Sequence, residues 1–244
     1  MDRGSSMASS EEATAVGNPF SNKAIRRAFV RKVYLILSVQ LLMTCAVISL
    51  TVFEPHTNEW VKRNPGFGML SLLLSFFILI PVQCCCPDVL RSFPCNFIIL
   101  FLFTATFATA TAFTTAAYDT HEVLLAAAIT GIVFISLTIF AMQSAIDFTA
   151  LNGIMFCFLI TLLLFGILVI FLGKTFPILR LVYSCLGALL FSVYIIVDTQ
   201  LIMGGERKLQ ISPEDYITAC LMLYLDVINL FLHILQIIRE VQKD

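Results

Sequence analysis

The sequence predicts an all-α membrane protein, a bundle of seven transmembrane helices. Hydrophobic residues make up 59% of the 244 positions and charged residues only 13%, whereas a soluble domain carries roughly 25% charge. Most of its seven apolar stretches approach the ~20 residues that a helix needs to cross a bilayer. Because irregular backbone is not tolerated against lipid, these stretches are expected to be helices rather than loops.

The expected spans follow one another with short polar connections. The second span is short and is expected to end at Pro81 and the CCCPD turn, because proline interrupts helical hydrogen bonding. Residues 54–66, EPHTNEWVKRNPG, are expected to form a polar loop. The seven spans cover about residues 33–53, 67–82, 95–117, 123–142, 154–172, 178–203 and 216–238.

The chain is expected to divide into a short disordered cytosolic tail, residues 1–22, and a seven-helix membrane domain, residues 23–244. The tail is small and polar, with no apolar segment of the signal-peptide type. Residues 23–32, KAIRRAFVRK, carry five of the fifteen basic residues and precede the first span. Since Lys and Arg are enriched on the cytoplasmic side, this cluster predicts a cytosolic N-terminus.

Two aspartates, Asp198 and Asp226, lie inside the otherwise apolar sixth and seventh spans. An Asp at the centre of a membrane helix costs about 3 kcal/mol on insertion scales, which makes each a candidate functional residue. On helical spacing Asp198 shares a face with Tyr194, and Asp226 shares one with Asn229. Helices joined by about a dozen residues are usually antiparallel neighbours, so the two carboxyl groups can face each other.

Two carboxylates at short range in a poorly solvated site repel each other, so that the pair is expected to share a proton near neutral pH. Their hard oxygens are also the ligands that Ca²⁺ prefers. Asp198 and Asp226 are therefore predicted to form a proton-sensitive Ca²⁺ site, with Tyr194 and Asn229 as supporting polar groups. The alternative is that each Asp caps a backbone group or pairs with a Tyr or Asn to fix helix packing.

Arg91 is the basic residue between the second and third spans. It is a candidate latch that could reach along the bundle, pair with one of the aspartates and hold a closed state. The alternative is an arginine that extends its charged head from the bundle into the membrane interface.

Cys84, Cys85 and Cys86 form a triplet at a membrane boundary. Cysteines beside a membrane span are candidates for palmitoylation. Packing at a helix end is the equal alternative, and the spacing to Cys95 does not match the usual zinc sites.

The motif content favours a protein that is not an enzyme. The sequence has no HExxH, GxSxG, phosphate-loop or dinucleotide fingerprint. Asp198 and Asp226 lack the Gly-Asp context of intramembrane aspartyl proteases. A net charge of −1 without a basic groove disfavours nucleic acid as a partner. No cofactor is expected, and the expected partners are membrane lipid, Ca²⁺ as a permeant or bound ion, and H⁺.

Residues 191–205, FSVYIIVDTQLIMGG, and residues 214–235, EDYITACLMLYLDVINLFLHIL, resemble the signature of the transmembrane Bax-inhibitor-motif family, lifeguard branch. The stretch AIDFT at 145–149 is similar to the polar connection between the fourth and fifth spans of that family. The resemblance covers roughly residues 25–240. The resemblance implies a seven-helix bundle whose last helix is central. It also implies a role in suppressing cell death, as in members of that family.

The resemblance also implies a slow, pH-dependent Ca²⁺ leak from internal stores, controlled by two aspartates that Asp198 and Asp226 match. In some relatives an arginine at the start of the third helix latches to this pair, and Arg91 is the candidate here. We therefore expect an endomembrane location, such as the endoplasmic reticulum or the Golgi.

Two functions remain open on the sequence. The first is a pH-sensitive Ca²⁺ leak channel of intracellular membranes, gated by the two aspartates and anti-apoptotic. The second is a non-conducting membrane regulator of cell death that acts through death-pathway or stress-signalling proteins. A seven-helix receptor is disfavoured, because the outside loops are short and lack a pair of cysteines.

Overall fold

The computed structural model describes residues 23–84, 87–173, 175–204, 207 and 209–242. Its described residues form helices and no strand, and seven helices are long and apolar enough to cross a membrane. The predicted all-α fold class is confirmed. The expected tail, residues 1–22, lies outside the described residues. The seven long helices are α2 (Lys23–Phe53), α4 (Pro65–Cys84), α5 (Cys95–Thr115), α6 (Thr120–Gln143), α7 (Asn152–Leu172), α8 (Ile178–Met203) and α9 (Tyr216–Gln242).

The structure corrects the expected polar loop 54–66, most of which is the short helix α3 (Pro55–Arg63). Pro55 stands in its first turn, where the missing amide hydrogen costs no hydrogen bond. Val61 is buried, and the ring of Trp60 packs on Phe67 and Phe113. The helix therefore buries one face and exposes its charged residues. With nine residues it is too short to cross a bilayer.

Two further boundaries differ from the expectation. Helix α2 already includes Lys23, ten residues before the expected span, because the Lys, Arg and Ala of this segment are good helix formers. Pro81 does not end the second span but lies inside α4, which continues to Cys84. Membrane helices tolerate an internal proline where neighbouring groups satisfy the backbone that it leaves unpaired.

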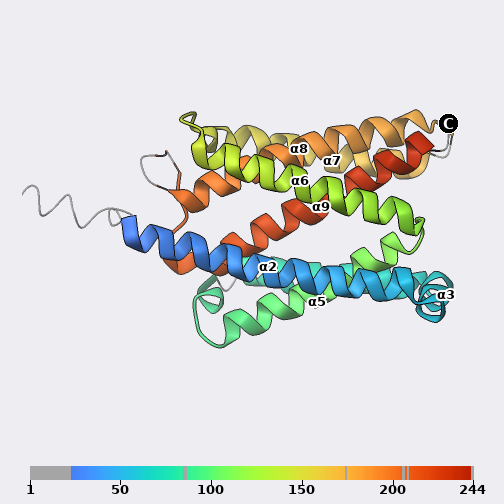
Figure 1. Ribbon diagram of the computed structural model, residues 1–244, viewed down its shortest axis with the longest axis horizontal. Helices are drawn as coiled ribbons and strands as arrows, with labels where there is room; N and C mark the ends of the chain where they lie inside the picture. Colours follow the sequence, from blue (N-terminus) through green and yellow to red (C-terminus); the bar gives the residue numbers. More distant parts are fainter. Residues whose placement is uncertain (1–22, 85–86, 174, 205–206, 208, 243–244) are drawn as a thin grey trace, which may run out of the picture.

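The long helices form two groups joined by α9 (Figure 1). In one group α5 packs against α2 and α4, and in the other α8 packs against α6 and α7. Helix α9 contacts α8 and α6 on one side and α2 and α5 on the other. The expectation that the last helix is central stays a prediction. The short helices η1 (Pro87–Leu90), η2 (Phe148–Leu151) and η3 (Pro213–Asp215) lie in the connections.

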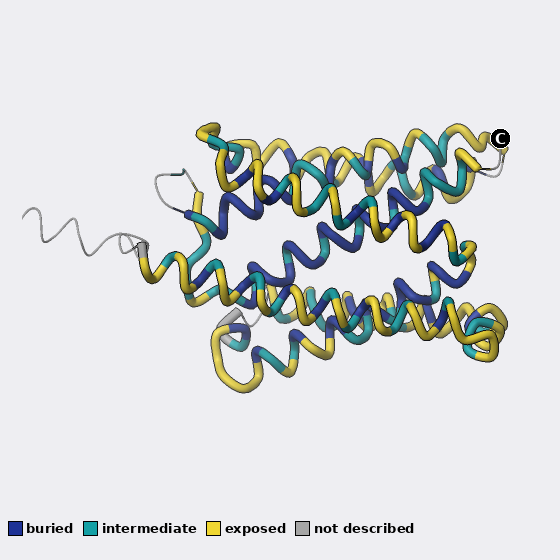
Figure 2. The backbone as a smooth tube through the Cα atoms, viewed as in Figure 1, coloured by how far each residue is buried: buried dark blue, intermediate teal, exposed yellow. Residues whose placement is uncertain are grey.

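Helix α9 is the most buried of the seven spans, with 67% of its most apolar window buried against 44% in α5, the next highest. Figure 2 shows the buried positions running along its length. Two apolar clusters hold it. One joins α9 to Phe29, Val33 and Leu37 of α2, and the other joins it to side chains of α6, α7 and α8.

Helix α9 runs from one end of the molecule to the other. It begins beside the start of α2, where the Lys32 ammonium lies 3.2 Å from the centre of the Tyr216 ring, and it ends at the opposite end (Figure 1). Its 27 residues span roughly 40 Å, more than the ~30 Å hydrocarbon core. Helix α9 is therefore long enough to cross a bilayer from one side to the other.

Candidate functional site

The structure brings Asp198 of α8 and Asp226 of α9 together. Their side chains are within hydrogen-bonding contact of each other, and they are 2% and 6% exposed. Among the described residues, Oδ1 of Asp198 and Oδ2 of Asp226 have no hydrogen-bond partner. Since buried polar atoms are normally paired, these two oxygens mark an unsatisfied polar site in the membrane domain.

The close approach of α8 and α9 depends on Gly187. A Cβ atom at this position would collide with the imidazole ring of His233 on α9. Tyr183 and Phe191 pack on the His233 ring at centroid distances of 5.1 and 5.6 Å, so a shift of this ring would disturb both contacts. Glycine at 187 therefore sets the helix spacing that also brings Asp198 to Asp226.

Gly187→Ala is expected to destabilise the fold by about 1–3 kcal/mol, the usual cost of overpacking a filled interior. Gly131→Ala is the matched control, since Gly131 lies inside α6 and a Cβ there meets nothing within 4 Å. Thermal unfolding in detergent measures both. Equal melting temperatures for the two variants would contradict this account of the α8–α9 contact.

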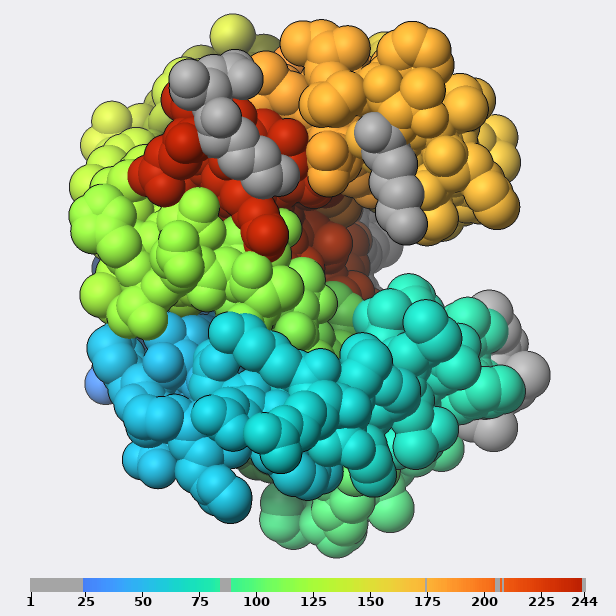
Figure 3. Space-filling model, turned by 90° about the vertical axis from the view of Figure 1, so that its right-hand side faces the viewer, coloured from blue at the N-terminus to red at the C-terminus, as the bar shows by residue number. Residues whose placement is uncertain are grey.

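A cleft of about 950 Å³ leads to the Asp198–Asp226 pair. Its walls are α4 and α5 on one side and α7 and α8 on the other, and α9 forms its floor. Figure 3 looks into its mouth, where α9 is visible at depth between α4 and the α7–α8 side. Tyr194 and Asn229 also line the cleft, and the Asn229 amide donates a 2.8 Å hydrogen bond to the carbonyl of Leu225.

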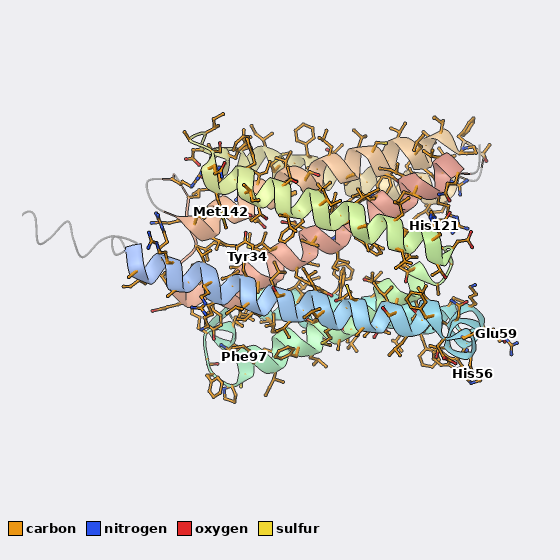
Figure 4. The ribbon with its side chains drawn as sticks, viewed as in Figure 1. Tyr34, His56, Glu59, Phe97, His121 and Met142 are labelled. Carbon is orange, nitrogen blue, oxygen red and sulfur yellow. The ribbon has the colours of Figure 1, made fainter. Side chains whose placement is uncertain are left out.

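Beyond the pair, toward the start of α2, side chains fill the interior. Tyr34 of α2 forms a 3.2 Å hydrogen bond with Thr199, the residue after Asp198, and Figure 4 shows it along the first half of α2. The apolar cluster around Val33, Leu37 and Ile217 lies on the same side. The pair is thus reached through the cleft and closed off toward the N-terminal end of α2.

Arg91 lies next to η3 and forms an ion pair with Asp215. Its Nε and Nη2 atoms donate hydrogen bonds of 2.8 and 3.1 Å to the two carboxylate oxygens. This two-point contact holds the connection before α5 against the start of α9. The role of Arg91 as a latch for Asp198 or Asp226 stays a prediction.

The cysteine triplet is described only in part, and the three histidines of the chain are scattered over the molecule. Cys84 is the last residue of α4, and Cys85 and Cys86 are not described, so their palmitoylation stays a prediction. His56 and His121 lie at the α3 end of the molecule (Figure 4). His233, by contrast, lines the cleft.

Sequence reasoning missed Gln200, which is fully buried two residues after Asp198. Its Oε1 accepts a 2.8 Å hydrogen bond from the Phe148 amide, and its Nε2 donates to the carbonyls of Ile146 at 3.0 Å and Ala141 at 3.4 Å. Gln200 thereby ties the AIDFT connection to the end of α8. A glutamine in an apolar helix was the signal that could have revealed it.

The comparisons with known proteins agree on one family. The family model described as "Inhibitor of apoptosis-promoting Bax1" matches residues 26–243. Protein lifeguard 3 of Homo sapiens is 38% identical over 238 residues, covering 94% of this chain and 75% of the relative. Protein lifeguard 3 of Mus musculus is 36% identical over 222 residues, covering 90% and 71%.

A yeast protein extends the comparison. Bax inhibitor 1 of Schizosaccharomyces pombe is 39% identical over 226 residues, covering 91% of this chain and 80% of the relative. The match runs through all seven long helices, including the segments that carry Asp198 and Asp226. The chain therefore belongs to the Bax inhibitor and lifeguard family of multi-pass membrane proteins.

Proposed function

We propose that this protein is a pH-sensitive Ca²⁺ leak channel of intracellular membranes, gated by Asp198 and Asp226, with an anti-apoptotic role. The observation that carries the proposal is the contact between two buried carboxyl groups, each with an unpartnered oxygen, at the inner end of a cleft. A hydrogen bond between two carboxyl groups requires a proton on one of them. The same pair therefore binds either a proton or a cation.

The direction of the pH dependence follows from charge. With one proton shared, the two carboxyl groups attract each other and hold α8 against α9. Without that proton they carry two negative charges, which repel each other and attract a divalent cation. We therefore expect the Ca²⁺ flux to increase as the pH increases.

The ligand set favours passage of the ion over tight binding. Ca²⁺ takes six to eight oxygen ligands, and the described residues contain no cluster of three or more His, Cys, Asp or Glu that could hold a metal. Two carboxylates leave most of the coordination to water or to carbonyl groups. Such a site binds an ion weakly enough to release it again.

Ca²⁺ entry into proteoliposomes tests this function. Purified protein in liposomes with a trapped Ca²⁺ indicator is compared with empty liposomes from about pH 6 to pH 8. The expected result is a flux above the empty liposomes that increases with pH. A flux equal to that of empty liposomes at every pH would contradict the channel.

One observation favours the second function, a non-conducting regulator of cell death that acts through protein partners. The interior between the Asp pair and the start of α2 is filled by buried side chains, so a conducting state requires these helices to move. Protection of cells from death stimuli separates the two functions. The channel predicts that an Asp198→Asn/Asp226→Asn double variant fails to protect, and the regulator predicts that it protects normally.

Arg91 supplies a separate test of the latch. Arg91→Gln removes the latch and is expected to increase the Ca²⁺ flux severalfold at fixed pH. Asp215→Asn removes the partner that holds Arg91 in this structure, which releases Arg91 to the Asp pair and decreases the flux. Because the ion pair is partly exposed, each variant costs only about 0–1 kcal/mol of stability. Flux changes of the same sign in the two variants would contradict the latch.

A further inference from the structure

The cleft is larger and more apolar than an ion site requires. Its volume of about 950 Å³ is at the upper end of the ~300–1,000 Å³ typical of small-molecule sites. Leu72 and Phe76 of α4 face Leu163 of α7 across it, and Phe107 of α5 contributes to the same wall. These side chains offer no ligand to a hydrated cation, but they suit a hydrocarbon chain.

The rims of the cleft are also apolar. Met69 on α4 is 68% exposed and Leu163 on α7 is 60% exposed, and both line the cleft. Helices α4 and α7 are long and apolar enough to cross a membrane, and Leu163 lies midway along α7, so this rim is expected to face the bilayer. The hollow visible in Figure 3 between the two groups of helices is thus accessible to a molecule that is dissolved in the lipid.

The inner end of the cleft is polar and acidic. Asp198 and Asp226 are more than nine-tenths buried and each has one oxygen without a partner. A protonated amine carries three hydrogen donors and a positive charge, which complements both oxygens. Lys62, the basic residue that lines the mouth, is exposed. Because water solvates the exposed Lys62 ammonium, the cleft-lining groups that lack a partner are the carboxyl oxygens of Asp198 and Asp226. These oxygens favour a cationic ligand.

We propose that the cleft binds a single-chain amphiphile with a protonated amine head. The head contacts Asp198 and Asp226, and the alkyl chain lies between α4 and α7 and extends toward the bilayer. This inference uses the carboxyl pair of the proposed function but does not rest on ion conduction. An amine and a Ca²⁺ ion compete for the same oxygens, so the bound amphiphile also blocks the leak.

The protein contains its own reporter for the test. Trp60 is the single tryptophan of the chain, and its ring lies 6.0 Å from that of Phe113, which lines the cleft. The probe is octadecylamine with bromine atoms on the chain, added to protein in nanodiscs of uncharged lipid without Ca²⁺. Brominated octadecanol and octadecanoic acid, with the same chain, control for partition into the bilayer.

The amine is expected to quench Trp60 fluorescence saturably, at a concentration at least about tenfold lower than the alcohol needs, because a charged hydrogen bond is worth at least that factor. Asp198→Asn and Asp226→Asn should abolish the difference between amine and alcohol. Glu59→Gln removes an exposed charge outside the cleft and should retain it. Equal quenching by amine and alcohol, or tighter binding of the acid, would overturn the proposal.

A steric pair of variants tests the position of the chain without changing the carboxyl groups. Leu163 and Leu164 are both 60% exposed on α7, but of the two only Leu163 is part of the described cleft lining. Retention of tritiated octadecylamine should fall severalfold in Leu163→Trp and stay unchanged in Leu164→Trp. Equal retention by the two variants would contradict a chain in the cleft. An absence of Ca²⁺ flux would contradict the proposed function and leave these binding results standing.

Discussion

Replacing Asp226 by Asn is expected to decrease the Ca²⁺ flux at pH 8 by at least about tenfold and to remove its dependence on pH. Asn keeps the shape of Asp but carries neither the negative charge that attracts the ion nor the group that binds the proton. A tenfold change corresponds to about 1.4 kcal/mol, which is less than the usual energetic effect of removing a buried charge. Indicator fluorescence in proteoliposomes from pH 6 to pH 8 measures both effects.

Asp198→Asn is expected to have the same effect on the Ca²⁺ flux and its pH dependence. The double variant should decrease the flux no further than either single variant does. The two side chains contact each other, and residues that act as a unit give non-additive effects. Glu59→Gln removes an exposed charge and should leave the pH profile unchanged. A single variant that keeps the wild-type pH profile would show that the pair is not the proton-sensitive element.

The largest stability effect is expected for Gln200→Leu. The substitution leaves the Phe148 amide without its partner, at a cost of about 1–3 kcal/mol if that amide stays buried. It also removes the shorter of two hydrogen bonds to the Ile146 carbonyl, which keeps only the 3.4 Å bond from Arg207. At a few degrees per kcal/mol for a chain of this size, the melting temperature should decrease by roughly 5–15 °C.

Gln143→Leu is the matched control for Gln200→Leu. Gln143 is the last residue of α6, close in sequence to the same connection, and its side chain is exposed. Thermal unfolding in detergent should show little change for this variant. A loss of stability as large as that of Gln200→Leu would mean that the hydrogen bonds of Gln200 are not what holds the AIDFT connection.

The spans and the Asp pair could be predicted because both depend on local properties of the sequence. Apolar runs of membrane length identify the spans directly. Asp198 and Asp226 stand out because charge is rare in such runs, and helical spacing with a short connection is enough to turn them toward each other. Helix α3 was missed because its nine residues carry an amphipathic pattern that resembles a polar loop.

The long-range contacts could not be predicted, because they depend on how distant segments meet. Gln200 bonds with a connection more than 50 residues earlier in the chain, and Arg91 pairs with Asp215 at a separation of 124 residues. The cleft is assembled from side chains of six helices. No single segment of sequence shows that α4 and α7 leave a hollow between them.

We propose that a cation and a shared proton compete at Asp198 and Asp226. Proton release on adding Ca²⁺ to purified protein in weakly buffered detergent at pH 7 tests it most directly, since metal binding to carboxyl groups displaces their protons. We expect proton release from the wild type and from Glu59→Gln, and none from Asp198→Asn/Asp226→Asn. No release from the wild type, or equal release from the double variant, would contradict it.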